Sequence, residues 1–160
     1  ILLFSILLSI YTAFLFAQAK GRDFWQSPLL ILHMLLHAVI GGSGLILIVG
    51  FFWEHINSMI PYIKNILIGG LVIQILSLAA ELITPHPTVD SIQTVKIITK
   101  GVFKVEFWGG VVFLGSFIPF LMLISSFSPI ILAFAGLLAL IGLWCSVRIW
   151  VIAPQMIPLS

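Results

Sequence analysis

Long apolar runs separated by short polar turns make up almost the whole chain. Five such runs can be placed, at residues 1–19, 29–53, 59–83, 105–127 and 129–152. A helix of about 20 apolar residues matches the roughly 30 Å hydrocarbon core of a bilayer. The runs lack the alternation of a membrane β-strand, and a helix satisfies its own backbone hydrogen bonds in lipid. The pattern therefore predicts five transmembrane helices.

Composition leads to the same fold class. Of the 160 residues, 61% are hydrophobic and only 8% are charged. A soluble domain of this size cannot cover so much apolar surface with a polar shell. We expect an all-α integral membrane protein, with residues 1–160 forming one bundle of about five transmembrane helices in the lipid bilayer. We expect no nucleic-acid partner. Because the chain starts at Ile1 inside an apolar run, we also expect further spans before it in a longer subunit.

The third and fourth runs are joined by a longer polar segment, residues 84–104. Apolar residues recur there at helical spacing and lysines recur four apart on another face: Val95, Ile98, Val102 and Phe103, against Lys96, Lys100 and Lys104. This pattern is typical of a short amphipathic helix, either on the membrane surface or serving only as a connector. Within the fourth run, Pro119 should kink the helix.

Basic residues are distributed unevenly over the turns. Lys20 and Arg22 flank the first turn and three lysines occupy the third, whereas the second turn offers only Lys64, near a helix start. In a chain with five spans the first and third turns share one side of the membrane. Cytoplasmic loops carry an excess of Lys and Arg. We therefore predict that these two turns and the C-terminus are cytoplasmic.

Small residues cluster inside the runs, and they allow helix backbones to approach closely. The clusters are Gly41-Gly42-Ser43-Gly44, Gly69-Gly70, Gly109-Gly110 with Gly115, and Gly136 with Gly142. We expect them to serve bundle packing. A ligand cleft at one of the clusters is the alternative.

Ionisable residues within or at the ends of the runs are the candidates for function, because each costs roughly 2.5–3.5 kcal/mol on insertion scales. His33 and His37 share one face of the second run; Glu81 ends the third, Glu106 begins the fourth and Arg148 lies near the inner end of the fifth. One interpretation is a proton path from the cytoplasmic side, for which histidine is suited because imidazole titrates near neutral pH. The alternative is snorkelling at the interface and hydrogen bonding between helices. We favour the interface for Glu81, Glu106 and Arg148, and function for the histidine pair.

Other chemistries are disfavoured. Two histidines four apart on one helix cannot bind opposite faces of one haem, and no other histidine lies inside a run, so we expect no haem. The single cysteine, Cys145, cannot hold an iron–sulfur cluster or an intramolecular disulfide. No cluster indicates a metal site, and no nucleotide-binding or hydrolytic motif is present. We therefore assign no catalytic residue.

Three stretches resemble the integral membrane subunits of polysulfide reductase, the NrfD-like family. They are Tyr11-Thr12-Ala13-Phe14 with Arg22-Asp23-Phe24-Trp25-Gln26-Ser27-Pro28; Phe107-Trp108-Gly109-Gly110-Val111 to Gly115 and Pro119; and Ala135-Gly136-Leu137 through Gly142 to Arg148, then Pro154-Gln155. Their order and spacing carry the resemblance, which covers nearly the whole chain. In the family's eight-helix members these runs would be the last five, so the resemblance implies part of an eight- to ten-helix subunit.

The resemblance implies a membrane anchor that reacts with a quinone (menaquinone or ubiquinone) in a respiratory electron-transport complex. It implies no haem or iron–sulfur cluster in this chain, an iron–sulfur (ferredoxin-like) partner subunit, a further redox subunit, and the cytoplasmic (inner) membrane of a prokaryote. The resemblance also implies a quinone contact at Tyr11, and proton translocation has been proposed for some members of the family. The chain departs from the family at Ala13, usually glycine, and at His33 and His37, where most members are apolar or hydroxylated. A secondary transporter or proton-conducting subunit without quinone chemistry is the alternative function, and a purely structural anchor is a third.

Overall fold

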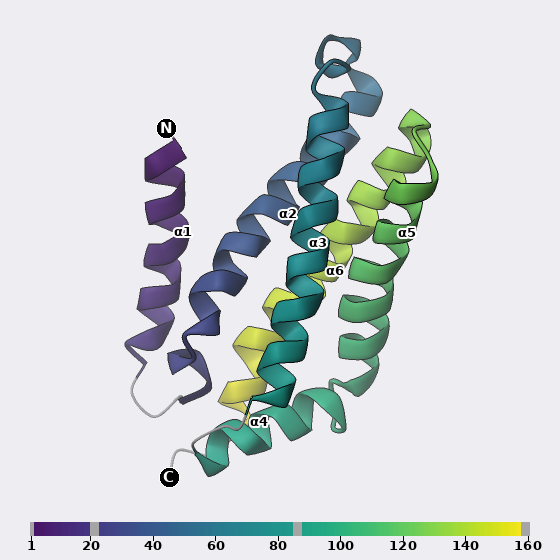
Figure 1. The fold of residues 1–160 in the computed structure, drawn as a ribbon. Coiled ribbons are helices and arrows are strands. Elements are labelled where there is room, and N and C mark those ends of the chain that lie inside the picture. The colour runs from purple at the N-terminus through teal and green to yellow at the C-terminus, as the bar shows by residue number, and fades with distance from the viewer. Residues whose placement is uncertain (1, 20–22, 85–87, 158–160) are drawn as a thin grey trace.

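The computed structural model describes residues 2–19, 23–84 and 88–157, apart from the side chains of Leu2 and Glu54. Lys20 and Arg22, used in the orientation argument, lie outside the described residues. All regular elements in the described part are helical (Figure 1): α1 (Leu2–Ala17), η1 (Asp23–Gln26), α2 (Leu29–Phe52), η2 (Glu54–Ile56), α3 (Ile60–Ile83), α4 (Val89–Thr99), η3 (Glu106–Phe117), α5 (Ile118–Ser125) and α6 (Pro129–Gln155).

Successive long helices run in opposite directions, and the short α4 lies across one end of the bundle (Figure 1). We call this the basal end; it holds η1, α4 and the last turn of α6. The upper end holds η2 and the junction between α5 and α6, residues 126–128. The basal end therefore holds the described residues of the first and third turns and the end of α6. Five antiparallel spans predict this arrangement.

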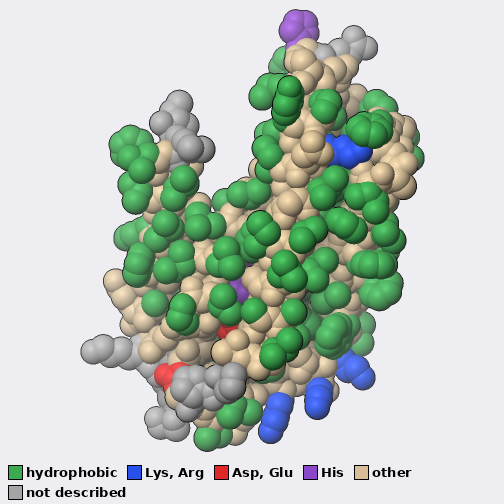
Figure 2. All heavy atoms as spheres, viewed as in Figure 1, with side chains coloured by type: hydrophobic (Ala, Val, Ile, Leu, Met, Phe, Trp, Pro, Cys, Tyr) green, Lys and Arg blue, Asp and Glu red, His purple; other side chains and the backbone are tan. Residues whose placement is uncertain are grey.

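The outer surface of the bundle is apolar. Four helical stretches are long and apolar enough to cross a membrane: α2, α3, η3 together with α5, and α6, while α1 is apolar but shorter. Figure 2 shows hydrophobic side chains over the visible face of the bundle, with Lys and Arg at the lower edge and a further basic side chain near the upper end. A soluble protein does not expose apolar surface on this scale. The predicted fold, an all-α integral membrane bundle, is confirmed.

Glycines set the closest helix contacts. Gly44 of α2 faces Gly136 of α6, where an added Cβ would lie 2.5 Å from the Gly44 carbonyl oxygen. Gly115 of η3 faces Gly142 of α6 so closely that a Cβ on either would overlap the other's Cα. Packing is therefore the role of these four glycines, as predicted. Nothing in the described structure lies within 4 Å of a Cβ added to Gly42.

Buried apolar side chains form two clusters along the bundle. The basal cluster includes Trp25, Phe107 and Trp150. The upper cluster consists of Leu36, Ile40, Leu47, Leu67, Leu71, Leu123, Leu132, Ala135 and Ala139. Buried polar side chains occur along the same helices, among them Ser43 of α2 and Gln74 of α3.

The fourth span is not one continuous α-helix. Residues Glu106–Phe117 form a π-helix, in which the Ile118 N–H donates to the carbonyl of Phe113, five residues earlier. The Ser116 hydroxyl likewise donates to the Val111 carbonyl at 2.9 Å. The α-helix α5 then begins directly before Pro119. Proline has no N–H to continue the hydrogen-bond ladder. The change of helix type lies next to Pro119, where a kink was predicted.

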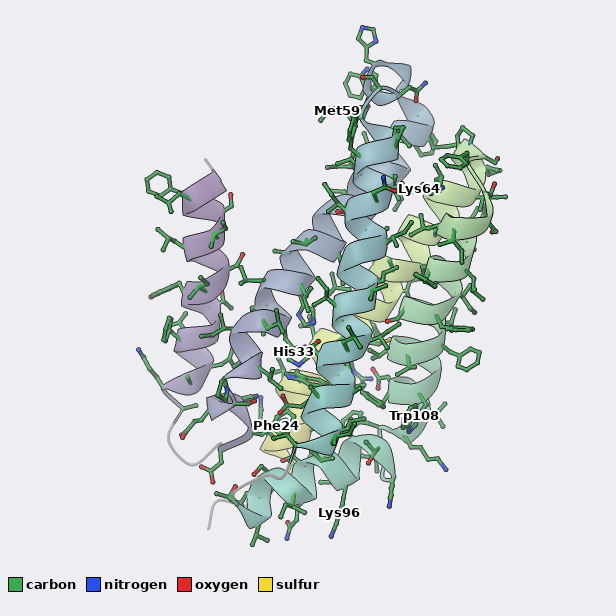
Figure 3. The ribbon with its side chains drawn as sticks, in the orientation of Figure 1. Phe24, His33, Met59, Lys64, Lys96 and Trp108 are labelled. Carbon is green, nitrogen blue, oxygen red and sulfur yellow. The ribbon has the colours of Figure 1, made fainter. Side chains whose placement is uncertain are left out.

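The polar connection contains the predicted amphipathic helix, but the helix is shorter than the pattern indicated. In α4 the Thr88 side chain accepts a hydrogen bond from the Ser91 N–H at 3.3 Å, which caps the first turn. The helix ends at Thr99, and Val102 lies beyond it with 72% of its surface exposed. Ile98 and Phe103 are buried. Lys96, labelled at the base of Figure 3, points away from the bundle.

Candidate functional site

The two histidines lie on the inward face of α2, one turn apart. Both are buried, and their ring centroids are 6.3 Å apart. The His33 ring packs against Trp150 of α6 at a centroid distance of 5.0 Å. Figure 3 shows His33 inside the bundle, where α2, α3 and α6 come together. The structure therefore places both imidazoles in the interior, away from lipid.

Glu81 of α3 reaches the same interior from the opposite side. Its Oε2 lies 4.0 Å from His33 Nε2, and the two side chains are 4% and 2% exposed. The Ser27 hydroxyl donates to the same Oε2 at 3.2 Å. The interfacial position favoured for Glu81 from the sequence is therefore wrong. The cause is tertiary: the turn before α2 brings Ser27 over the last turn of α3 and covers the carboxyl group.

His37 continues the polar groups one turn deeper. Its Nε2 lies 3.4 Å from the Ser146 hydroxyl of α6. Three buried atoms have no hydrogen-bond partner in the part of the chain that the structure describes: His33 Nε2, His37 Nδ1 and Gln74 Oε1. A buried polar atom left unpaired costs about 1–3 kcal/mol. Such atoms mark positions where water or a ligand completes the hydrogen bonding.

A groove at the basal end gives access to Glu81. Its volume is about 570 Å³, and it is lined by Asp23, Phe24, Gln26, Ser27, Pro28, Leu29, Ala80, Glu81, Thr84, Thr88 and Ser91. Small-molecule sites are typically about 300–1,000 Å³ with a few polar groups in a largely apolar wall. Glu81 both lines this groove and contacts His33. The Glu81–His33–His37 series therefore leads from the groove into the bundle.

Glu106 and Arg148 form a separate pair. Arg148 Nη1 donates to Glu106 Oε1 at 2.8 Å and to Oε2 at 2.6 Å. The Arg148 side chain is 44% exposed, and its guanidinium lies 5.8 Å from the centroid of the Trp144 ring. Both contacts lie outside the Glu81–His33–His37 series. The interfacial interpretation of these two residues fits this arrangement better than the proton path.

Tyr11 lies apart from the series as well. It is 58% exposed on α1, whereas its neighbour Thr12 lines a small cavity of about 120 Å³ beside Trp150. The described structure brings no buried ionisable group to the Tyr11 side chain. Its quinone contact, implied by the resemblance, stays a prediction.

Three residues of the site were not selected from the sequence: Ser27, Ser146 and Trp150. Ser27 directly precedes Pro28 at a helix start, where a side-chain hydroxyl is ordinarily assigned to capping. Ser146 follows Gly142 by four residues, so the small-residue face of the last run was a signal for its inward direction. Trp150 lies near the end of its run, where tryptophan is common at a membrane interface, but it is 4% exposed and packs against His33. No grouping of three His, Cys, Asp or Glu residues suited to a metal ion occurs among the described residues.

The sequence comparison identifies the family. A family model described as "Polysulphide reductase, NrfD" matches residues 1–158. The chain belongs to the NrfD family. It is thus a membrane subunit of the kind found in polysulphide reductases and related reductase complexes, and the resemblance drawn from its motifs is confirmed. No curated protein and no solved structure gives a significant match to this NrfD chain.

Proposed function

We propose that this NrfD-family chain is the quinone- or quinol-reactive membrane subunit of a respiratory oxidoreductase complex, and that it exchanges electrons with an iron–sulfur subunit. The observation that supports this most is the basal groove, which ends at Glu81 with a buried histidine behind it. A quinone takes up two electrons and two protons to become a quinol. The groove offers the proton chemistry on the chain's own side chains, and the partner subunits supply the electrons.

The residues of the groove fit a quinone headgroup. Ser27 supplies a hydroxyl and Glu81 a carboxyl group within hydrogen-bonding distance of one another, and Phe24 and Leu29 supply an apolar wall. In the proposed role Glu81 holds and passes a proton at Oε2, the atom nearest His33. Ser27 orients that carboxyl group by its hydrogen bond, and His33, 4.0 Å away, replenishes the proton. Tyr11 of α1 does not line the basal groove, so a quinone contact at Tyr11 would be a second quinone-binding position.

Purification of the intact complex tests the proposal. From membranes of the native host, this subunit is expected to copurify with an iron–sulfur protein and with bound menaquinone or ubiquinone. The measurements are iron and acid-labile sulfide content, and quinone extraction with mass spectrometry. A subunit that purifies with neither would overturn the proposal and favour the second candidate below.

A proton-conducting or secondary transport function without quinone is the second candidate. The observation in its favour is that the polar groups continue past Glu81 to His37, Ser146 and the unpaired Gln74 Oε1, deeper than a groove site requires. Against it stands the distribution of buried ionisable side chains: among the described residues, none lies between His37 and Lys64 at the upper end. The buried polar groups on that stretch, such as Ser43 and Gln74, carry no titratable proton.

Replacing the histidine pair separates a functional role from a packing role. The variants His33→Leu and His37→Leu are expected to slow quinol turnover and proton uptake while leaving assembly intact, because leucine fills the space but carries no proton. Turnover of the purified complex and pH change in weakly buffered vesicles are the measurements. His55→Leu is the control, since His55 is exposed on η2. Unchanged turnover and proton uptake in both variants would leave His33 and His37 as packing residues.

A further inference from the structure

Lys64 is a buried cation at the upper end, opposite the groove. Its residue is 4% exposed, although it lies only one turn into α3. Its Nζ donates to the Ser126 carbonyl at 3.1 Å and lies 3.3 Å from the centroid of the Phe127 ring. The described residues place no carboxylate within 4.0 Å of it. Figure 3 shows Lys64 between α3 and the α5–α6 side of the bundle.

Part of this environment is explained by helix capping. Ser126 directly follows the last residue of α5, and a cation near a helix C-terminus is stabilised by the helix dipole. Capping uses one of the three N–H donors of the ammonium group, and the aromatic ring partly offsets its loss of water. Among the side chains that the structure describes, which do not include Glu54, no anion lies beside this positive charge. A buried charge ordinarily has such a partner.

The space around Lys64 suits a ligand from the membrane. A cavity of about 180 Å³ is lined by Lys64 and Asn57, with Gly50, Phe51 and Phe127 among its apolar walls. Phe51 also lines a second, wholly apolar groove of about 260 Å³ on the surface between α2 and α6. The other residues of this groove are Ile48, Phe52, Ile130, Ala133, Phe134 and Leu137. A cation at the end of the bundle thus adjoins an apolar groove that continues along the spans.

We propose that Lys64 binds the phosphate of a phospholipid in the leaflet at the upper end, with an acyl chain lying in the groove between α2 and α6. Charge complementarity selects a phosphate, because charged hydrogen bonds to phosphate are strong and the ammonium retains free donors. The adjoining apolar groove selects a lipid over free phosphate. This site is independent of the quinone chemistry proposed for the basal end.

Native mass spectrometry of the intact complex tests the lipid site. After delipidation, the wild type is titrated with phosphatidylglycerol and, separately, with inorganic phosphate at millimolar concentration. Tight binding of one phosphatidylglycerol is expected, weakened about tenfold or more in Lys64→Met and restored in Lys64→Arg. Lys100→Met is the matched control, because Lys100 is exposed at the basal end. Its lipid binding is expected to equal that of the wild type.

A second variant guards against a loss of folding in Lys64→Met. Ala133→Trp fills the apolar groove and leaves the Lys64 contacts in place, so it should also lose the lipid. Lipid binding that persists in Ala133→Trp, or that is equal in Lys64→Met and Lys100→Met, would overturn the proposal and leave Lys64 as a helix cap. Inorganic phosphate that displaces the lipid at equal affinity would also overturn it, since the groove would then contribute nothing.

Discussion

Quinol turnover is expected to fall about a hundredfold when Glu81 is replaced by glutamine. Loss of a positioned proton donor or acceptor typically costs a factor of about 10²–10⁴. Glutamine keeps the volume of the side chain and still accepts a hydrogen bond from Ser27, so the groove should retain its shape. What is lost is the proton beside His33. The measurement is the steady-state rate of the purified complex with a soluble quinol, together with quinone affinity by titration.

Glu106→Gln is the matched control for this substitution. Glu106 is also a carboxyl group near the basal end of a span, but it contacts Arg148 and not the histidines. Its replacement is expected to change turnover by no more than a few fold. Equal rates in the two variants, whether both slow or both normal, would contradict a specific proton-carrying role for Glu81. A large loss of quinone affinity at unchanged maximal rate would instead assign Glu81 to binding alone.

Replacing Gly142 with alanine is expected to be the most destabilising glycine-to-alanine change among the described residues. A Cβ at this position would overlap the Gly115 Cα, which is backbone and cannot rotate away. Overpacking a tight contact costs about 1–3 kcal/mol, and more where nothing can yield. Thermal melting in detergent and the yield of folded protein measure the effect.

Gly42→Ala is the control for the glycine contact. Nothing in the described structure lies within 4 Å of a Cβ at Gly42, which sits on the same α2 that carries Gly44. Alanine is favoured over glycine in a helix interior by about 1 kcal/mol. The Gly42 variant should therefore melt at or above the temperature of the wild type. If Gly142→Ala is equally stable, then α6 and η3 do not pack as closely as described.

The number, order and approximate limits of the long helices were accessible from the sequence because apolar runs of bilayer length have few other interpretations. The inward face of each helix was harder to predict. In spans that are apolar all round, hydrophobicity does not separate the lipid side from the core side. Only small and polar residues do so, and the pair His33 and His37 correctly marked the interior face of α2.

The partners of those residues were not accessible in the same way. Contact between Glu81 and His33 joins residues 48 positions apart, and the nearby Ser27 comes from a turn that reads as an ordinary helix start. Pairing of Glu106 with Arg148 likewise required the crossing of η3 and α6. The π-helix was not predicted, because a change in the backbone hydrogen-bond pattern leaves no signal in the side-chain periodicity of an apolar run.

The depth of His37 has an electrical consequence. His37 lies eight residues into α2, which is about 12 Å along the helix axis. Beyond it, no further buried ionisable side chain occurs before Lys64 among the described residues. A proton that moves from the basal groove to His37 crosses only part of the membrane voltage. A full crossing is worth about 2.3 kcal/mol per charge at 100 mV. Proton transfer confined to these residues should therefore move only a fraction of an elementary charge across the membrane per turnover. Such turnover would neither generate nor consume much membrane potential.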